Sequence, residues 1–300
     1  MELTTFVKCS ELSKQLGQPG LVIIDCRFDL RDPAAGQIAY QRGHIPGAYY
    51  ADLNHDLSSP PTAHSGRHPL PDPNRFSSRL KSWGIDERTG VVAYDDQQGS
   101  IAARMWWLLR WSGVSNCAVL SEGWSSWLKN GYPTSKVEPA QFQNKRESHT
   151  VHVNNEWVVD ANFVGAHAGD PAFCLIDVRA RERFLGLSEP IDSVAGHIPG
   201  ALNLPLSELM MPTGVIKEPA TLTEIFRGLT GNVTASNTIF TCGSGVTACY
   251  GLLAYAHSGA PPARLYAGSW SEWIRDSNRP IARGPHSDIA AADPHRRLSP

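Results

Sequence analysis

Four short motifs occur twice in this chain, in the same order and about half a chain length apart. The pairs are Ile23–Arg27 with Leu175–Arg179, Gly43–Ala48 with Gly196–Ala201, Val91–Asp95 with Thr238–Cys242, and Gly123–Trp127 with Ser269–Trp273. Four matched segments at nearly one spacing indicate a duplicated domain. The sequence therefore predicts two homologous domains, over residues 1–138 and 157–285. The polar stretch 139–156 is predicted to be a linker, and residues 286–300 a loose tail.

The charge balance and the apolar content narrow the class of protein. Lys and Arg number 27 and Asp and Glu 29, so that 27 − 29 = −2, which removes the strong electrostatic case for nucleic acid or an anionic membrane as partner. Hydrophobic residues make up 41% of the chain, enough for sizeable cores. No apolar run approaches the ~18 residues of a membrane-spanning helix, and the N-terminus lacks a signal-peptide pattern. We therefore expect a cytoplasmic protein.

The six cysteines are scattered over the whole chain. They are Cys9, Cys26, Cys117, Cys174, Cys242 and Cys249. Without a secretory signal, a disulfide framework is not expected. No Cys-x-x-Cys pair and no matching histidine pair is present, so the sequence predicts no metal site. Most of these thiols are expected to be small buried side chains.

Short β-branched runs alternate with helical stretches in both halves. The predicted strands are Leu21–Ile24, Val91–Tyr94, Ala118–Leu120, Cys174–Asp177, Thr238–Thr241 and Leu265–Tyr266. The predicted helices are Ile101–Trp111, Ser125–Asn130, Thr247–His257 and Ser271–Asp276. This alternation predicts an α/β fold with a central, mainly parallel sheet flanked by helices in each domain. In such sheets ligands bind beyond the carboxyl ends of the strands.

One strand end carries residues suited to covalent chemistry. The predicted strand Thr238–Thr241 leads directly into Cys242-Gly243-Ser244-Gly245-Val246-Thr247, after which a helix begins. The glycines let successive backbone N–H groups point inward as an anion-binding nest, and the helix N-terminus adds partial positive charge. Both effects favour the thiolate of Cys242, which is the nucleophilic form. The alternative is a buried cysteine before a glycine turn.

With these motifs together, the chain resembles a two-domain sulfurtransferase of the rhodanese superfamily over nearly its whole length. The resemblance implies that only the second domain is catalytic, and Asp95 stands where the first domain lacks the cysteine. It also implies a double displacement, in which Cys242 takes sulfur from a donor as a persulfide and passes it to an acceptor. This chemistry needs no cofactor.

The resemblance also implies substrate-binding residues. Arg183 matches an arginine that contacts the substrate anion, and the loop residues Gly243, Gly245, Val246 and Thr247 are expected to cradle the sulfur. Arg179 is a further candidate, four residues before Arg183 and on the same face if the segment is helical. Since Arg27 repeats Arg179 in the domain without the cysteine, a structural role is favoured for it. The same argument assigns structural roles to the residues that both copies keep, which are Asp25, Asp177, His44 and His197.

The identity of Ser244 indicates which sulfur donor the enzyme uses. Relatives that use 3-mercaptopyruvate carry Cys-Gly-Ser-Gly-Val-Thr, whereas those that use thiosulfate tend to place basic side chains in this loop. In the former group the serine is thought to work with a histidine and an aspartate, and His68 matches that histidine. Asp52 is a less certain match for the aspartate. Asn54 holds the expected place, and Asp56 is an alternative.

One departure concerns the substrate carboxylate. Relatives of the mercaptopyruvate type carry a further arginine where this chain has Asp192, so that contact is either missing or supplied elsewhere, with Arg67 as a candidate. We therefore expect a preference for 3-mercaptopyruvate, with thiosulfate as the alternative donor. The acceptor is left open between cyanide, a small thiol and a thioredoxin-like protein, and a monomer is expected.

Two other classes of function are known alternatives for a rhodanese-like fold. Rhodanese-like phosphatases have a loop one residue longer, with the pattern Cys-x5-Arg. The place of that arginine, six residues after Cys242, is held by Ala248 here. Alanine cannot hold a phosphoryl group as an arginine does. A non-enzymatic rhodanese-like carrier or interaction module is the other class. The intact Cys242 and its loop glycines argue against it for the second domain.

Overall fold

The computed structural model describes residues 3–140 and 153–285. The chain divides into two compact units. The first unit is Met1–Pro60 with Leu70–Asn154, and the second is Asn155–Pro300 with the separate segment Pro61–Pro69. Most of the predicted linker 139–156 and all of the predicted tail 286–300 lie outside the described residues, so the predicted domain limits stay a prediction.

Each unit is built on a five-stranded parallel sheet. The first has the order β1-β5-β4-β2-β3 and the second β6-β10-β9-β7-β8. The strands of the first sheet are β1 (Phe6–Val7), β2 (Leu21–Asp25), β3 (Tyr49–Tyr50), β4 (Gly90–Tyr94) and β5 (Cys117–Leu120). Those of the second are β6 (Val158–Val159), β7 (Cys174–Asp177), β8 (Leu202–Asn203), β9 (Thr238–Thr241) and β10 (Arg264–Tyr266). The predicted α/β fold is confirmed.

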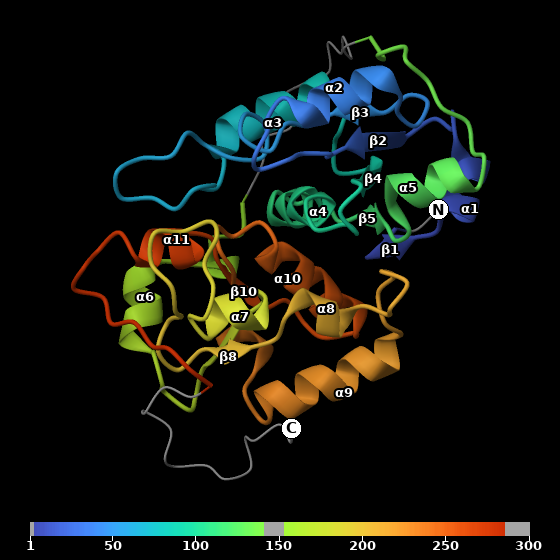
Figure 1. The fold of residues 1–300 in the computed structure, drawn as a ribbon. Coiled ribbons are helices and arrows are strands. Elements are labelled where there is room, and N and C mark those ends of the chain that lie inside the picture. Colours follow the sequence, from blue (N-terminus) through green and yellow to red (C-terminus); the bar gives the residue numbers. More distant parts are fainter. Residues whose placement is uncertain (1–2, 141–152, 286–300) are drawn as a thin grey trace. The chain divides into compact units, whose positions relative to one another are not determined.

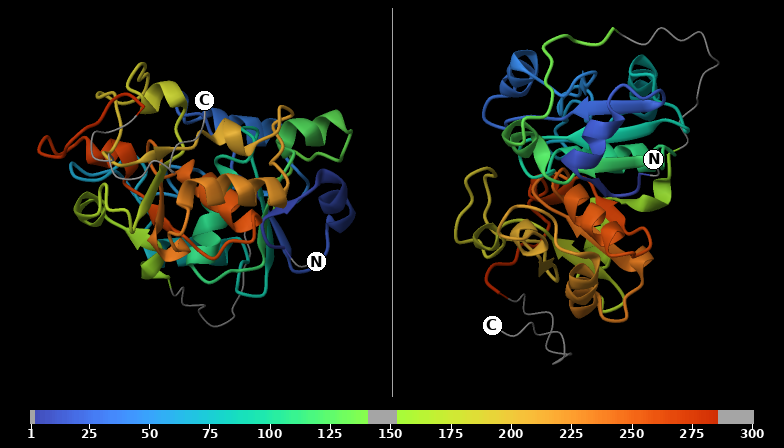
Figure 2. Two further views of the ribbon diagram at one scale, coloured as in Figure 1. Left: turned by 90° about the horizontal axis from the view of Figure 1, so that it is seen from below. Right: turned by 90° about the vertical axis from the view of Figure 1, so that its right-hand side faces the viewer.

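Helices cover both faces of each sheet, as the ribbon and its turned views show (Figures 1 and 2). The first unit contains α1 (Cys9–Leu12), α2 (Ala35–Arg42), α3 (Pro73–Ser82), α4 (Ala102–Trp111) and α5 (Gly123–Lys129). The second contains α6 (Ala161–Ala166), α7 (Arg181–Phe184), α8 (Leu206–Leu209), α9 (Pro219–Thr230), α10 (Ala248–His257) and α11 (Ser269–Trp273). Short 3-10 turns are formed by Ser13–Gln15, Asn155–Trp157 and Ala235–Asn237. None of the helices in the described ranges is long and apolar enough to cross a membrane.

Burial explains why the central strands are continuously apolar. β4 and β9 are buried at every residue, as expected for parallel strands covered on both faces. One face of the first sheet packs on Leu12 of α1 and Trp127 of α5, and α4 contacts the sheet as well. In the second unit, Trp270 and Trp273 of α11 occupy the corresponding core, and α10 contacts β9 and β10. The helix that follows the cysteine loop is thus fixed to the strand before it.

Each unit has its own copy of one polar brace, at the carboxyl end of β2 in the first unit and of β7 in the second. Arg27 pairs with Asp25 at 2.6 Å and donates to the carbonyl of Gly43. Arg179 pairs with Asp177 at 2.7 Å and donates to the carbonyl of Gly196. Each arginine lies over a tryptophan ring, with 4.5 Å and 4.9 Å between the guanidinium carbon and the ring centre. A buried charge is tolerated when it is paired and hydrogen-bonded in this way, which supports the structural role expected for these residues.

The predicted strands agree with the structure to within one residue at each end. The predicted bounds of one helix, Ser271–Asp276, are wrong, because α11 spans Ser269–Trp273. The N–H groups of Trp270 and Ser271 donate to the carbonyls of Cys242 and Gly243, so a distant loop fixes the start of this helix. Asp276 instead closes the turn that follows, where its side chain accepts from the N–H of Asn278.

Candidate active site

The cysteine loop joins β9 to α10 and leaves no room for a side chain at one position. Gly245 has a φ of 74°, a left-handed conformation that glycine adopts without strain. A Cβ atom placed on it would lie 2.2 Å from the carbonyl oxygen of Ala267. Glycine is therefore required there by both conformation and space, and its N–H is turned toward Cys242.

Cys242 is buried, with 1% of its surface exposed, and both its backbone and its sulfur are held. Its N–H donates to Oγ of Ser269 at 3.1 Å. The N–H of Gly245 donates to its Sγ at 3.1 Å. The sulfur therefore already accepts one bond from the loop that curls around it.

Three further N–H groups at the end of the loop have no acceptor among the described residues. Across residues 3–140 and 153–285, none is found for the N–H groups of Val246, Thr247 and Ala248. These groups begin α10, where the first N–H groups of a helix lack intrahelical partners and favour an anion. A negatively charged atom bonded to Sγ of Cys242 is the kind of group that such N–H groups stabilise.

Two arginines approach the loop from different segments. A Cβ atom placed on Gly243 would lie 3.5 Å from Nη2 of Arg183 and 3.5 Å from Nη2 of Arg67. Arg183 comes from α7, whereas Arg67 comes from Pro61–Pro69. Both guanidinium groups therefore flank the residue that follows the nucleophile.

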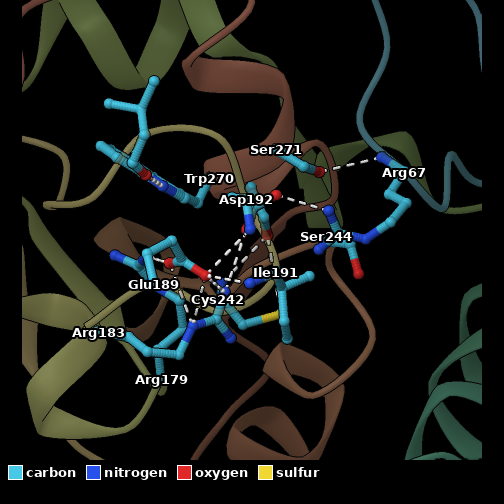
Figure 3. A network of polar contacts seen from close by, with 12 residues as sticks. Arg67, Arg179, Arg183, Glu189, Ile191, Asp192, Cys242, Ser244, Trp270 and Ser271 are labelled. Carbon is cyan, nitrogen blue, oxygen red and sulfur yellow. Dashed lines mark hydrogen bonds and ion pairs between the residues drawn. The ribbon is translucent and has the colours of Figure 1, made fainter. Parts of the chain in front are cut away.

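Two carboxylates hold these arginines (Figure 3). Glu189 accepts from Nε and Nη2 of Arg183, at 3.0 and 2.8 Å. Asp192 accepts from Nη2 of Arg183 at 3.1 Å through one oxygen and from Nη1 of Arg67 at 2.5 Å through the other. The pairing with Arg183 helps to lower the pKa of Glu189 against the opposing effect of burial. Arg67 thus occupies the region where the sequence left a carboxylate contact unassigned.

Arg179 is placed differently from Arg183. It precedes α7, which begins at Arg181, so the two arginines do not share a helix face as the sequence suggested. Its side chain is 1% exposed and pairs with Asp177 and, at 3.5 Å, with Glu189. Burial acts to lower the pKa of Arg179, but Asp177, Glu189 and Cys242 raise it overall. Arg179 is a fixed cation behind the site.

His68 and Ser244 meet, as the sequence predicted. Nδ1 of His68 lies 2.8 Å from Oγ of Ser244, and both residues are buried. The segment that carries His68 is seated by Gly66, where a Cβ atom would lie 2.4 Å from the carbonyl oxygen of Gly268. The N–H of Arg67 also donates to Oγ of Ser271. This histidine therefore reaches the cysteine loop because a glycine permits close backbone contact.

The two aspartates considered as a third member of this group belong to the first unit and have partners there. Asp52 accepts from the N–H groups of Asn54 and His55 and from the His55 ring. Asp56 pairs with Arg79 at 2.6 Å and accepts from the N–H of Asp52. Burial raises the pKa of Asp56, against the opposing effects of the Asp52 N–H and Arg79. Asp52 remains a prediction as a relay residue, and its contacts are those of a turn.

Ser269 is a residue that the sequence reasoning missed. Its φ is 54°, unusual for a residue other than glycine, and it is fully buried. Its Oγ accepts from the N–H of Cys242 and donates to the carbonyl of Tyr266. The first copy of the motif has Gly123 at this place, so a comparison of the two repeats could have found it.

No cluster of three or more His, Cys, Asp or Glu side chains suited to a metal occurs in residues 3–140 and 153–285. All six cysteines lie within the described residues, where they are buried and form no disulfide. Burial raises the pKa of Cys9, and of Cys117 to about 12. It raises the pKa of Cys26 as well. These three thiols are thus kept in the unreactive form.

The chain belongs to the rhodanese family, since the rhodanese-like domain matches it twice, at residues 8–130 and 160–276. A protein of Pseudomonas aeruginosa named as a probable 3-mercaptopyruvate sulfurtransferase is 41% identical over 95% of this chain and 100% of its own length. Thiosulfate sulfurtransferase of Rattus norvegicus is 33% identical over 86% of both chains. The solved 3-mercaptopyruvate sulfurtransferase of Leishmania major superposes with a TM-score of 0.78 at 27% identity, over 90% of this chain and 74% of that one. The prediction of a rhodanese-type sulfurtransferase is confirmed.

Proposed function

We propose that this enzyme transfers sulfur from 3-mercaptopyruvate to a thiophilic acceptor through a persulfide on Cys242. The observation that carries the proposal is the cradle around Cys242. One N–H already contacts its sulfur, and those of Val246, Thr247 and Ala248 have no acceptor in the described parts of the chain. Such a cradle stabilises a negative charge one atom beyond the sulfur, where the persulfide carries it.

In the first half-reaction the Cys242 thiolate attacks the sulfur of the donor. A sulfur–sulfur bond forms and the donor's carbon–sulfur bond breaks, leaving its electron pair on carbon as the enolate of pyruvate. The proton of the donor thiol ends on that carbon, so pyruvate and the persulfide anion are the products. The covalent intermediate divides one difficult transfer into two steps.

Ser244 and His68 are proposed to carry the proton in this step. Their 2.8 Å contact lets a proton pass between hydroxyl and imidazole. Ser244 lies two residues after Cys242, so the pair belongs to the same loop as the nucleophile. Arg183 and Arg67 are proposed to hold the donor carboxylate, with Nη2 of each directed at Gly243.

In the second half-reaction an acceptor nucleophile attacks the terminal sulfur. Its bond to sulfur forms as the sulfur–sulfur bond breaks, and the thiolate of Cys242 returns. Cyanide, a small thiol or a thioredoxin-like protein would each complete this step. We further propose a cytoplasmic location, because six cysteines outside any disulfide suit a reducing compartment, and we propose that the enzyme is a monomer.

Thiosulfate is the second candidate donor. Two guanidinium groups beside Gly243 suit a dianion better than one would. The absence of a basic residue at Ser244 argues against it. The rhodanese-like carrier without enzymatic activity is disfavoured by the held cysteine itself.

Mass spectrometry after incubation with donor tests the sulfur carrier. The peptide containing Cys242 should gain about 32 Da, the mass of one sulfur atom, and Cys242→Ser should abolish both the gain and the turnover. Cys249→Ser is the matched control, since Cys249 lies seven residues on, inside α10. A persulfide that persists in the Cys242→Ser protein would contradict the assignment.

Steady-state kinetics with both donors test the donor choice. We expect kcat/KM for 3-mercaptopyruvate to exceed that for thiosulfate by about ten- to a hundredfold, the equivalent of one charge-assisted contact. Ser244→Lys should narrow this ratio, and Arg183→Ala should depress both donors. Equal efficiency with both donors in the unmodified enzyme would overturn the choice of 3-mercaptopyruvate and leave the persulfide mechanism standing.

A further inference from the structure

Asp192 binds the two arginines that flank the cysteine loop. One carboxylate oxygen lies 3.1 Å from Nη2 of Arg183 and the other 2.5 Å from Nη1 of Arg67. The carboxylate is 3% exposed, while Arg183 and Arg67 are 17% and 28% exposed. It therefore lies on the inner side of the arginine pair and is more shielded from water than either cation.

The position of Asp192 is set by its own loop. Glu189 accepts from the N–H groups of Ile191 and Asp192, at 3.1 Å each, through the oxygen that also binds Arg183. The turn from Glu189 to Asp192 is thus folded around a carboxylate. Asp192 is presented to the arginines by this turn and is not free to swing away.

The arginines keep donors that Asp192 does not use. Nε of Arg67 is buried without a hydrogen-bond partner in the described chain, and Nη2 of Arg67 and Nη1 of Arg183 lie 3.5 and 3.7 Å from the place of a Cβ atom on Gly243. An anionic donor can therefore be hydrogen-bonded while Asp192 stays in place. What it meets is a cation pair that already has a counter-ion.

The charges of the whole cluster sum to zero. Three positive and three negative side chains give 3 − 3 = 0, namely Arg67, Arg179 and Arg183 with Asp177, Glu189 and Asp192. Without Asp192 the sum is +1. The energy between the donor and the missing charge is proportional to the donor's own charge, so removing Asp192 favours a dianion twice as strongly as a monoanion.

We infer that Asp192 is a specificity-determining residue, a built-in counter-ion on Arg67 and Arg183 that makes the donor site select a singly charged carboxylate over a dianion. The inference rests on the proposed sulfur transfer. It explains how a site with two arginines beside the nucleophile can disfavour thiosulfate. Asp192 acts through the arginines and takes no part in bond making.

Kinetics of Asp192→Asn at low ionic strength test this role. We expect KM to fall about threefold for 3-mercaptopyruvate and about tenfold for thiosulfate, since the electrostatic energy doubles with the donor's charge, while kcat changes little. Asp192→Glu keeps the charge and should keep the donor ratio of the unmodified enzyme. Glu182→Gln is the matched control, because Glu182 is an exposed acid in the same region, and both KM values should stay within about twofold.

A purely structural role for Asp192 predicts the opposite result. The arginines would lose their support in Asp192→Asn, and KM would rise for both donors by one factor. That rise, or equal KM changes for the two donors, would overturn the inference.

A measurement on the unmodified enzyme covers the case in which Asp192→Asn does not fold. Inhibition constants of sulfate and acetate should differ by less than about tenfold, because the neutralised cluster gains little from a second charge. Sulfate bound at least about tenfold more tightly than acetate would also overturn the inference. The mass gain on Cys242 with either donor reports separately on the sulfur transfer itself, so its failure is recognised independently.

Discussion

The loops after β4 and β9 carry two different side chains, Asp95 and Cys242, at equivalent places in the two copies. In the first, Asp95 accepts four backbone hydrogen bonds, from Gln97 and Gly99 on one oxygen and from Ile101 and Ala102 on the other, at 2.7–2.8 Å. In the second, Sγ of Cys242 accepts one backbone hydrogen bond, from Gly245, and a longer contact of 4.0 Å from Oγ of Ser269. In the first loop, therefore, the carboxylate of Asp95 accepts the inward N–H groups of its own loop. In the second loop, the N–H groups of residues 246–248 have no acceptor among the described residues.

The loop lengths follow the same distinction. From Asp95 to the first residue of α4 is 102 − 95 = 7 positions, and from Cys242 to the first residue of α10 is 248 − 242 = 6. The extra residue in the first loop lets two carboxylate oxygens be surrounded. Burial raises the pKa of Asp95, while the four N–H groups oppose the rise. The loop after β4 is thus an anion cradle that is filled by its own carboxylate.

Moving the cysteine into the first loop should not move the chemistry. In Cys242→Ser protein we expect Asp95→Cys to leave turnover at background, at least about a thousandfold below the unmodified enzyme. The first loop lacks the Gly-Ser-Gly sequence and the arginine pair of the second. The measurement is persulfide mass and turnover. Clear rescue by Asp95→Cys would show that the nest alone makes a cysteine competent.

Removing the carboxylate should unfold the first loop. Asp95→Ala leaves four inward N–H groups without an acceptor, and we expect the first unit to lose about 3 kcal/mol of unfolding free energy. Urea unfolding and hydrogen exchange of the amides at 97–102 measure the effect. Asp96→Ala, at an exposed neighbour, is the control and should cost less than about 0.5 kcal/mol. An equal loss in both variants would refute a cradle held by Asp95.

The smallest effect concerns the left-handed residue that closes each loop, Gly123 at φ 67° and Ser269 at φ 54°. Gly123→Ser should cost about 1 kcal/mol of stability, because its Cβ would lie 3.1 Å from the carbonyl oxygen of Asp95. Ser269→Gly should leave stability nearly unchanged, since relief of strain offsets the lost hydrogen bonds, but lower kcat by about tenfold. Unchanged kcat would mean that the Ser269 hydroxyl does not position Cys242.

Ser269→Ala separates the two effects, because alanine keeps the strained conformation and loses the hydroxyl. We expect it to be less stable than Ser269→Gly by about 1 kcal/mol. Urea unfolding of the two variants side by side provides the comparison.

The parts of the fold that the sequence predicts are the fully buried strands, because burial on both faces requires a continuous apolar run. β7 and β9 are buried throughout and were placed at their observed ends. The two-residue edge strands, such as β3 and β8, are too short to carry any period. α9 was missed although Pro219 at its start is a helix signal.

The predictable parts of the site are those within one stretch of chain. Cys242 and its glycines could be found because strand, nest and helix follow one another directly. The bridge from Asp192 to Arg67 joins residues 125 apart in sequence, and only the fold brings them together. Ser269 lay between these cases, since its strain is visible only beside Gly123 of the other repeat.

The seating of Pro61–Pro69 has a consequence for how such an enzyme can be divided. The second unit, which carries Cys242, includes the nine residues Pro61–Pro69 from within the first repeat. A polypeptide that begins at residue 155 would keep Cys242 and its cradle yet lack both His68 and Arg67. Transfer of the second repeat alone into another protein would therefore carry Cys242 without the two side chains that the segment Pro61–Pro69 supplies.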